Sequence, residues 1–221
     1  MKTLVLVFHP DMSASRVNRS LAARAATLGD DVTVRYMYDI YPDQKVDVAA
    51  EQAALEAADR VVLQFPMYWY STPALLKQWE DDVLLYGWAY GSTGNALAGK
   101  ELLVAVSTGG AGDAYSREAS YGYTITELLR PLQATANMVQ MTYLEPFTTT
   151  GTLTITDEAL AQRVETTRPH WRARTCPSWS LTAERAGTQL PHARGPRTGE
   201  PAWGPRCVSR ESQSPSARSL K

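Results

Sequence analysis

The sequence has little cysteine and no long apolar run near its start. Its 221 residues include two cysteines, Cys176 and Cys207, so the preceding part can form neither a disulfide framework nor a thiolate metal site. These two also lack the further cysteines or the histidine spacing that zinc requires, and we expect no metal. The apolar stretch in "MKTLVLVFHPDMS" is too short for a signal peptide or a membrane span. These absences predict a soluble, cytoplasmic protein.

The last 54 residues contain no isoleucine, methionine, phenylalanine or tyrosine. They carry 10 basic and three acidic residues, whereas residues 1–167 carry 12 basic and 20 acidic residues. Such a segment buries too little apolar area to offset the entropy of ordering it. We therefore predict one domain over 1–167 and a basic tail over 168–221, rich in proline, arginine and serine, without a fold of its own. The tail is either a functional disordered arm or the product of an out-of-register reading frame, which its composition favours. No nucleic-acid partner is expected.

Short apolar runs alternate with helical patterns along residues 1–167. Five runs rich in valine and leucine predict strands covered on both faces, at 3–8, 32–36, 60–65, 102–107 and 139–143. Helices are predicted at 17–28, at 49–58, from residue 75, from residue 125 with a kink or a restart at Pro131, and from residue 156, where Thr156 can cap. This alternation predicts an α/β fold, a doubly wound five-stranded parallel sheet in the flavodoxin-like order 2-1-3-4-5.

The loop after the first predicted strand carries neither a G-x-x-x-x-G-K-[ST] nor a G-x-G-x-x-G sequence, which disfavours a P-loop nucleotidase and a classical dinucleotide fold. It reads "HPDMSASRVN" instead, with hydroxyls and a cation at the entry to a helix. The N-terminus of a helix presents unpaired N–H groups and partial positive charge, so this loop predicts a phosphate site. An ordinary helix cap would explain Ser15, but not its combination with His9 and Arg16.

Two further unusual loops follow strands that end at the same edge of the predicted sheet. The stretch "STGGAGDAYS" at 107–116 has three glycines in four positions, which lets the backbone approach a ligand and point N–H donors at it. The stretch "FPMYWYSTPALLKQW" at 65–79 carries rings suited to stacking on a planar ligand. Ligands of doubly wound sheets bind beyond the carboxyl ends of the strands. The three loops together predict a pocket for flavin mononucleotide (FMN).

Four motifs resemble those of the flavodoxin-like NAD(P)H:quinone oxidoreductases, the family of DT-diaphorase and of small bacterial quinone reductases that serve glutathione-gated potassium efflux systems. They are "HPDMSASRVN" (9–18), "QFPMYWYSTPALLKQW" (64–79), "ALAGKELLVAVSTGGAGDAYS" (96–116) and "LLRPLQATANMVQMTYLEPF" (128–147). They occur in the family's order, and the resemblance covers about 1–166.

The resemblance implies a role for each loop. The flavin phosphate and ribityl chain would be held by His9, Ser15, Arg16, Val17 and Asn18. The isoalloxazine would contact Pro66, Met67, Tyr68, Trp69 and Tyr70, and its pyrimidine side would bond to Ser107, Thr108, Gly109, Gly110 and Tyr115. Tyr115 matches an active-site tyrosine of the family and is expected to be catalytic together with Tyr121, which falls near a histidine of the mammalian enzymes.

The implied activity is two-electron transfer of hydride from NAD(P)H through flavin N5 to a quinone, with FMN rather than FAD as the cofactor. A homodimer is implied because a second subunit completes the family's pocket, and the Gly-rich, aromatic segment 84–97 suits a pocket rim or dimer contact. Azo- or nitroreductase activity is an alternative. Another is a regulatory subunit held at the inner face of the membrane by a potassium efflux partner. A defective product with a shortened last helix is a further one, and we expect that ending the chain at Thr167 costs little stability.

Overall fold

The computed structural model describes residues 1–172, and the rest of the predicted tail, 173–221, lies outside the described residues. Its one sheet contains six strands: β1 (Thr3–Val7), β2 (Val32–Tyr36), β3 (Arg60–Pro66), β4 (Glu101–Ser107), β5 (Thr142–Tyr143) and β6 (Phe147–Thr149). The order is β2-β1-β3-β4-β5, and β6 also pairs with β4. Every strand pair is parallel. The predicted flavodoxin-like α/β sheet is therefore confirmed.

The fifth position of the sheet is filled by two short strands rather than the single strand predicted at 139–143. β5 pairs with Glu101 and Leu102 at the start of β4, and β6 pairs with the last three residues of β4. Pro146 lies between them and has no N–H to donate to a ladder, which suits the break. Because β6 runs beside the end of β4, the segment that follows it reaches the edge where the predicted ligand loops lie.

Four of the helices begin at residues whose side chains satisfy one of their first N–H groups. Ser15, Asp47, Thr124 and Thr156 each accept a hydrogen bond as N-cap. Pro131 stands in the first turn of a new helix, so the predicted restart is confirmed. The helices are α1 (Arg16–Ala26), α2 (Met37–Ile40), α3 (Val48–Ala57), α4 (Ala74–Val83), α5 (Ile125–Leu128), α6 (Arg130–Met138), α7 (Asp157–Glu165) and α8 (Thr167–Arg172), with a 3₁₀ turn at Gly112–Ala114.

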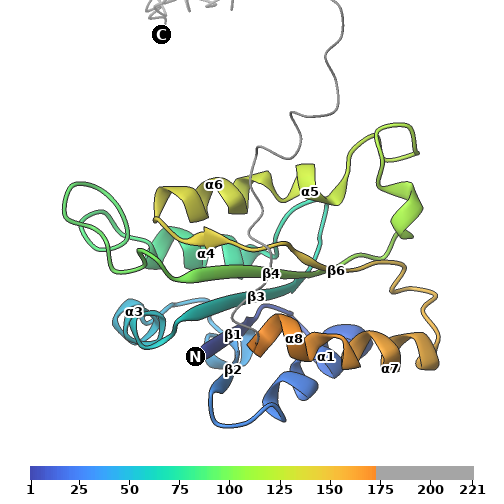
Figure 1. Cartoon of the computed structure of the whole chain (residues 1–221), viewed down its shortest axis with the longest axis horizontal. Coiled ribbons are helices and arrows are strands. Elements are labelled where there is room, and N and C mark those ends of the chain that lie inside the picture. Colours follow the sequence, from blue (N-terminus) through green and yellow to red (C-terminus); the bar gives the residue numbers. More distant parts are fainter. Residues whose placement is uncertain (173–221) are drawn as a thin grey trace, which may run out of the picture. The chain divides into compact units, whose positions relative to one another are not determined.

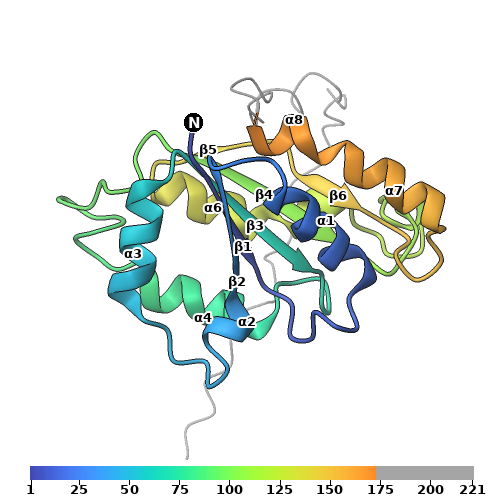
Figure 2. The same ribbon diagram turned by 90° about the horizontal axis from the view of Figure 1, so that it is seen from below.

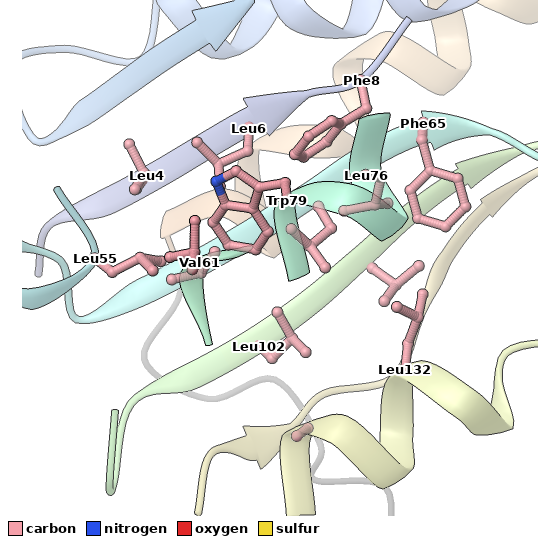
Figure 3. Close-up of a cluster of buried hydrophobic side chains, with 14 of the residues drawn as sticks. Leu4, Leu6, Phe8, Leu55, Val61, Phe65, Leu76, Trp79, Leu102 and Leu132 are labelled. Atoms are coloured by element: carbon pink, nitrogen blue, oxygen red, sulfur yellow. The ribbon is translucent and has the colours of Figure 1, made fainter. Parts of the chain in front are cut away.

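Helices cover both faces of the sheet, as Figures 1 and 2 show: α3, α4 and α6 lie on one face, and α1, α7 and α8 on the other. On the first face, Trp79 of α4 meets Phe8 edge to face, at 5.9 Å between ring centroids, among the leucines and valines drawn in Figure 3. Within residues 1–172, no helix is long and apolar enough to cross a membrane.

The folded part continues beyond Thr167, where the prediction placed its end. Residues 167–172 form α8, and Trp171 is fully buried against Phe147, with ring centroids 5.1 Å apart. The Trp171 carbonyl accepts a hydrogen bond from the Thr3 hydroxyl at 2.8 Å, and the buried Arg60 guanidinium donates to the carbonyl of His170. The folded part therefore extends past the predicted boundary, and the buried Trp171 leads us to expect that truncation at Thr167 lowers stability, contrary to the prediction from composition.

Candidate functional site

A cleft of about 390 Å³ lies at the carboxyl ends of β1, β3 and β4. The predicted site residues that line it are His9, Ser15, Arg16, Val17, Asn18, Pro66, Met67, Tyr68, Ser107 and Gly109. Ala14, Thr152 and Leu153 line it as well. Three separate predicted loops thus converge at one edge of the sheet, as the strand order requires.

The amino end of α1 forms one wall of this cleft. Ser15 caps the helix, and its hydroxyl oxygen accepts a hydrogen bond from the amide of Asn18 at 3.2 Å. This oxygen is therefore already used by the helix. The amides of Arg16 and Val17 belong to the first turn, where an α-helix offers N–H groups that have no intrahelical partner. They give the cleft two donors and the positive end of the helix dipole, which suit an anion.

His9 is held in one neutral tautomer by the loop itself. Its Nδ1 accepts the amide of Asp11 at 3.1 Å, which leaves the proton on Nε2. Burial lowers the pKa of His9 below its usual 6.5, and the nearby Asp11 charge opposes that shift. The ring therefore offers an N–H donor rather than a full positive charge at neutral pH.

The cation predicted for the phosphate, Arg16, and the neighbouring Arg19 are already engaged. Arg16 pairs with Asp157, at the start of α7, at 2.6 Å, and Arg19 donates to the carbonyl of Ser13 at 3.1 Å. The Ser13 hydroxyl turns away to Asp11, at 2.6 Å. An anion in this cleft would therefore meet backbone N–H groups, with Arg16 close by but shared with a carboxylate.

A hydrogen-bonded chain ties the first loop to the other two. The Asn18 Nδ2 donates to the Ser107 Oγ at 2.9 Å, and the Met67 amide donates to the Ser107 carbonyl at 2.8 Å. Asn18 is buried, yet its Oδ1 has no hydrogen-bond partner among the described residues. A buried acceptor without a donor is costly unless a ligand or water supplies one. This unpaired oxygen therefore fits a hydroxyl-bearing ligand such as the ribityl chain of FMN.

The glycine-rich loop presents N–H groups of its own. Within the part of the chain that the structure describes, the amides of Gly109 and Gly110 have no protein acceptor. The loop is anchored instead by the Thr108 amide, which donates to Thr149 at 2.9 Å, and by the Gly110 carbonyl, which accepts from Gly151 at 2.7 Å. Thr108 is buried and holds the loop in place rather than lining the cleft.

Thr152 and Leu153 were missed by the sequence predictions. The Thr152 amide donates to the Thr108 carbonyl at 3.0 Å, and the exposed Leu153 side chain lies over Gly109. They come from the segment after β6, a strand that the sequence did not reveal. The threonine- and glycine-rich stretch "TTTGTLT" was the available signal for a loop at the sheet edge.

The aromatic residues after β3 form a tight turn. The amides of Tyr68 and Ser71 each donate to the other's carbonyl at 3.0 Å. Between them Trp69 and Tyr70 both adopt positive φ angles, 47° and 63°, which ordinary side chains rarely take. The turn leaves Trp69 93% exposed, and neither Trp69 nor Tyr70 lines the cleft. The predicted ring wall thus consists of Pro66, Met67 and Tyr68, with Trp69 standing outside.

The two tyrosines predicted to be catalytic lie together. Tyr115 and Tyr121 have ring centroids 4.8 Å apart, and Tyr70 meets Tyr121 edge to face at 6.0 Å. The Tyr121 ring lies against Gly110, so close that a Cβ at that glycine would stand 2.7 Å from the tyrosine hydroxyl. The absence of a side chain at Gly110 is therefore what admits Tyr121 to this position.

The sheet order and the cleft at its carboxyl edge define a protein of the flavodoxin-like class, and the family described as flavodoxin-like fold matches residues 1–173. The chain is 49% identical, over 165 residues, to the uncharacterized NAD(P)H oxidoreductase YrkL of Bacillus subtilis, which covers 75% of this chain and 94% of the relative. It is 44% identical, over 171 residues, to the glutathione-regulated potassium-efflux system ancillary protein KefF of Klebsiella pneumoniae, covering 77% and 93%.

Among solved structures, general stress protein 14 of Treponema denticola in complex with FMN superposes with a TM-score of 0.70. The two chains are 42% identical, and the match covers 77% of this chain and 95% of that one. The chain belongs to the flavodoxin-like NAD(P)H:quinone oxidoreductase family, which includes KefF-like ancillary proteins and general stress protein 14.

Proposed function

We propose that this protein is an FMN-dependent NAD(P)H:quinone oxidoreductase. One observation carries the proposal: the cleft brings together the amino end of α1, the buried Asn18 and Gly109, whose amide has no acceptor among residues 1–172. A phosphate, a polyol and a ring with carbonyl oxygens need these three features in this succession. The FMN-bound relative supports the assignment of the cofactor.

Each residue of the cleft then has a definite task. The Arg16 and Val17 amides and the Nε2–H of His9 donate to the phosphate end, while the Asn18 Oδ1 accepts from a ribityl hydroxyl. The amides of Gly109 and Gly110 donate to the oxygens of the ring, where they stabilise negative charge that develops on reduction. Bound FMN would supply the hydride chemistry between NAD(P)H and the quinone.

Tyr115 and Tyr121 are proposed as the catalytic hydroxyls. Their rings lie together beside the glycine loop, so either phenol can donate a hydrogen bond or a proton to an acceptor oxygen held above the cleft. Trp69, exposed outside the cleft, offers an aromatic face to a planar acceptor. Azo- and nitro-compounds share that planarity. Comparing the reduction rates of a quinone, an azo dye and a nitroarene therefore shows which class of acceptor the enzyme prefers.

A homodimer would complete this site. A groove of about 520 Å³ runs between α4 and the pair α5 and α6. Its lining includes the apolar Leu84, Pro131 and Met138 beside the charged Lys77, Glu80 and Asp81. Met138 and Tyr86 are large and mostly exposed, which favours a covering partner. Sedimentation at micromolar concentration tests this, and a monomer that reduces quinones at full rate would refute it.

The visible spectrum of the purified protein tests the cofactor and the reaction together. We expect a yellow protein, or one that becomes yellow with FMN, that bleaches with NADH or NADPH in the absence of oxygen and recovers its colour with a quinone. Asn18→Ala is expected to weaken FMN binding, whereas Asn137→Ala, on α6 away from the cleft, serves as the matched control. A colourless protein that FMN does not reconstitute would refute the proposal.

A second role is proposed on the likeness to KefF, the ancillary protein of a potassium efflux system. The same reductase would then also bind a membrane transporter at the inner face of the membrane. Co-purification with a potassium efflux protein from detergent-solubilised membranes supports this role. Potassium efflux that is unchanged after deletion of the gene counts against it.

A further inference from the structure

Gln64 is a polar side chain in the middle of the sheet. It is fully buried on β3, where its register partners are Val7 on β1 and Ala105 on β4. The surrounding side chains on that face, among them Val5 and Val62, are apolar and buried. A hydrophobic side chain would suit this position for packing, so the glutamine needs another explanation.

The hydrogen bonds of Gln64 reach both ends of the first ligand loop. Its backbone carbonyl accepts the amide of Phe8 at 2.8 Å, directly before His9. Its side-chain Nε2 donates to the backbone carbonyl of Asn18, also at 2.8 Å, in the first turn of α1. One residue therefore fixes where the loop leaves the sheet and where it enters the helix.

The connection continues into the cleft through Asn18. Asn18 donates to Ser107, and the carbonyl of Ser107 accepts from Met67, so the three loops share one hydrogen-bonded chain that starts at Gln64. Asn18, Ser107 and Met67 line the cleft, whereas Gln64 does not. The influence of the Gln64 side chain on a ligand therefore passes through Asn18, whose carbonyl it binds.

Gln64 is also incompletely satisfied. Its Oε1 is buried and has no hydrogen-bond partner among residues 1–172. An unpaired buried acceptor destabilises a fold, and such groups are concentrated where a function keeps them. The glutamine thus costs stability at a position where an apolar residue of the same length would not.

We propose that Gln64 is a positioning residue for the cofactor cleft: it holds the His9–Asn18 loop and the first turn of α1 in the geometry that binds the phosphate and ribityl chain of FMN. The inference rests on the proposed FMN site and adds a residue that touches no ligand. On this inference, the geometry that binds FMN needs the Gln64 side chain, whereas the stability of the apoprotein does not need it.

The test compares Gln64→Met with Gln133→Met in the full chain. Both changes replace a buried glutamine by an unbranched apolar residue of similar length, and Gln133 lies on α6, outside the cleft. Three quantities are measured: FMN affinity by quenching of flavin fluorescence, the unfolding midpoint of the apoprotein, and hydrogen exchange of the amides at 13–18 in the apoprotein.

Gln64→Met is expected to weaken FMN affinity about five- to tenfold, the equivalent of one lost hydrogen bond. It should also leave the apoprotein midpoint unchanged or higher and speed exchange in the loop. Gln133→Met is expected to change neither FMN affinity nor exchange in the loop. Unchanged affinity and exchange, or an affinity loss that only follows a lower midpoint, would overturn the inference. If the wild-type protein binds no FMN, the proposed function fails, and the exchange measurement still decides whether Gln64 orders the loop.

Discussion

Replacing Trp171 with alanine is expected to destabilise the protein severely, although this residue lies in the segment that composition predicted to be unfolded. Its side chain is fully buried between α1 and the sheet, in edge-to-face contact with Phe147 at 5.1 Å. A buried tryptophan removes roughly 200 Å² from water, worth up to ~5 kcal/mol at 25 cal/mol/Å². Mutational series place such truncations at about 3–5 kcal/mol.

Two features of the contact refine this magnitude. The Trp171 Nε1–H is buried without an acceptor among residues 1–172, so the native tryptophan carries a penalty that its removal relieves. Trp171→Phe removes that orphan donor and keeps most of the ring, so we expect it to cost less than about 1.5 kcal/mol. The Thr3 bond to the Trp171 carbonyl involves the backbone and survives both substitutions.

Urea unfolding followed by far-UV circular dichroism measures these differences in the full chain. A second comparison ends the chain after Thr167 or after Arg172, since only the shorter product loses Trp171 and the His170 carbonyl that Arg60 binds. A loss below about 0.5 kcal/mol for Trp171→Ala, or equal stability of the two truncated chains, would refute the reasoning.

Other expected outcomes concern single side chains. Burial raises the pKa of Glu80 to about 7, so the folded protein holds this proton more tightly than the unfolded chain and loses stability as pH rises from 4.5 to about 7. Glu80→Gln should therefore be more stable than wild type by about 1–3 kcal/mol at pH 8 and no different at pH 4, in urea titrations. Asp11→Asn should lower the pKa of His9 further, because the Asp11 charge raises it; an NMR titration showing a rise would contradict this. Gly110→Ala should displace the Tyr121 ring and slow quinone reduction with less than about 1 kcal/mol lost in stability; an unmoved ring in a crystal structure of the variant would count against it.

The sheet could be predicted from the sequence because each strand is identified by a short stretch of neighbouring residues. Runs of apolar residues between helical patterns identify buried parallel strands, and the end of β3 at Pro66 places the aromatic loop at the ligand edge. The cleft residues of the first loop, such as Ser15 and Asn18, were predictable for the same reason, since a helix entry with hydroxyls and amides is a local signal.

The remaining features depend on contacts between distant residues or on backbone geometry. Arg60 and His170 lie 110 positions apart, and no window of sequence shows that the guanidinium binds this carbonyl. The average composition of the last segment gave no sign that one of its tryptophans, Trp171, is buried. The direction of Trp69 follows from a positive φ, so the aromatic content of the loop was readable but its placement outside the cleft was not.

Several unfavourable features of this fold lie at the ligand edge of the sheet. Trp69 and Tyr70 hold a turn that glycine or asparagine adopts far more readily, and Asn18 and Gln64 each keep a buried oxygen that has no donor among the residues that the structure describes. By contrast, the buried Glu51 in the opposite core accepts hydrogen bonds from Tyr41 and Trp79 and an ion pair from Arg35. Not every buried group away from this edge is matched, since the Trp171 Nε1–H has no acceptor among residues 1–172. The ligand edge differs in combining an unpaired buried acceptor, the Asn18 Oδ1, with two rare backbone conformations, and the proposed ligand would supply the donor that Asn18 lacks among residues 1–172.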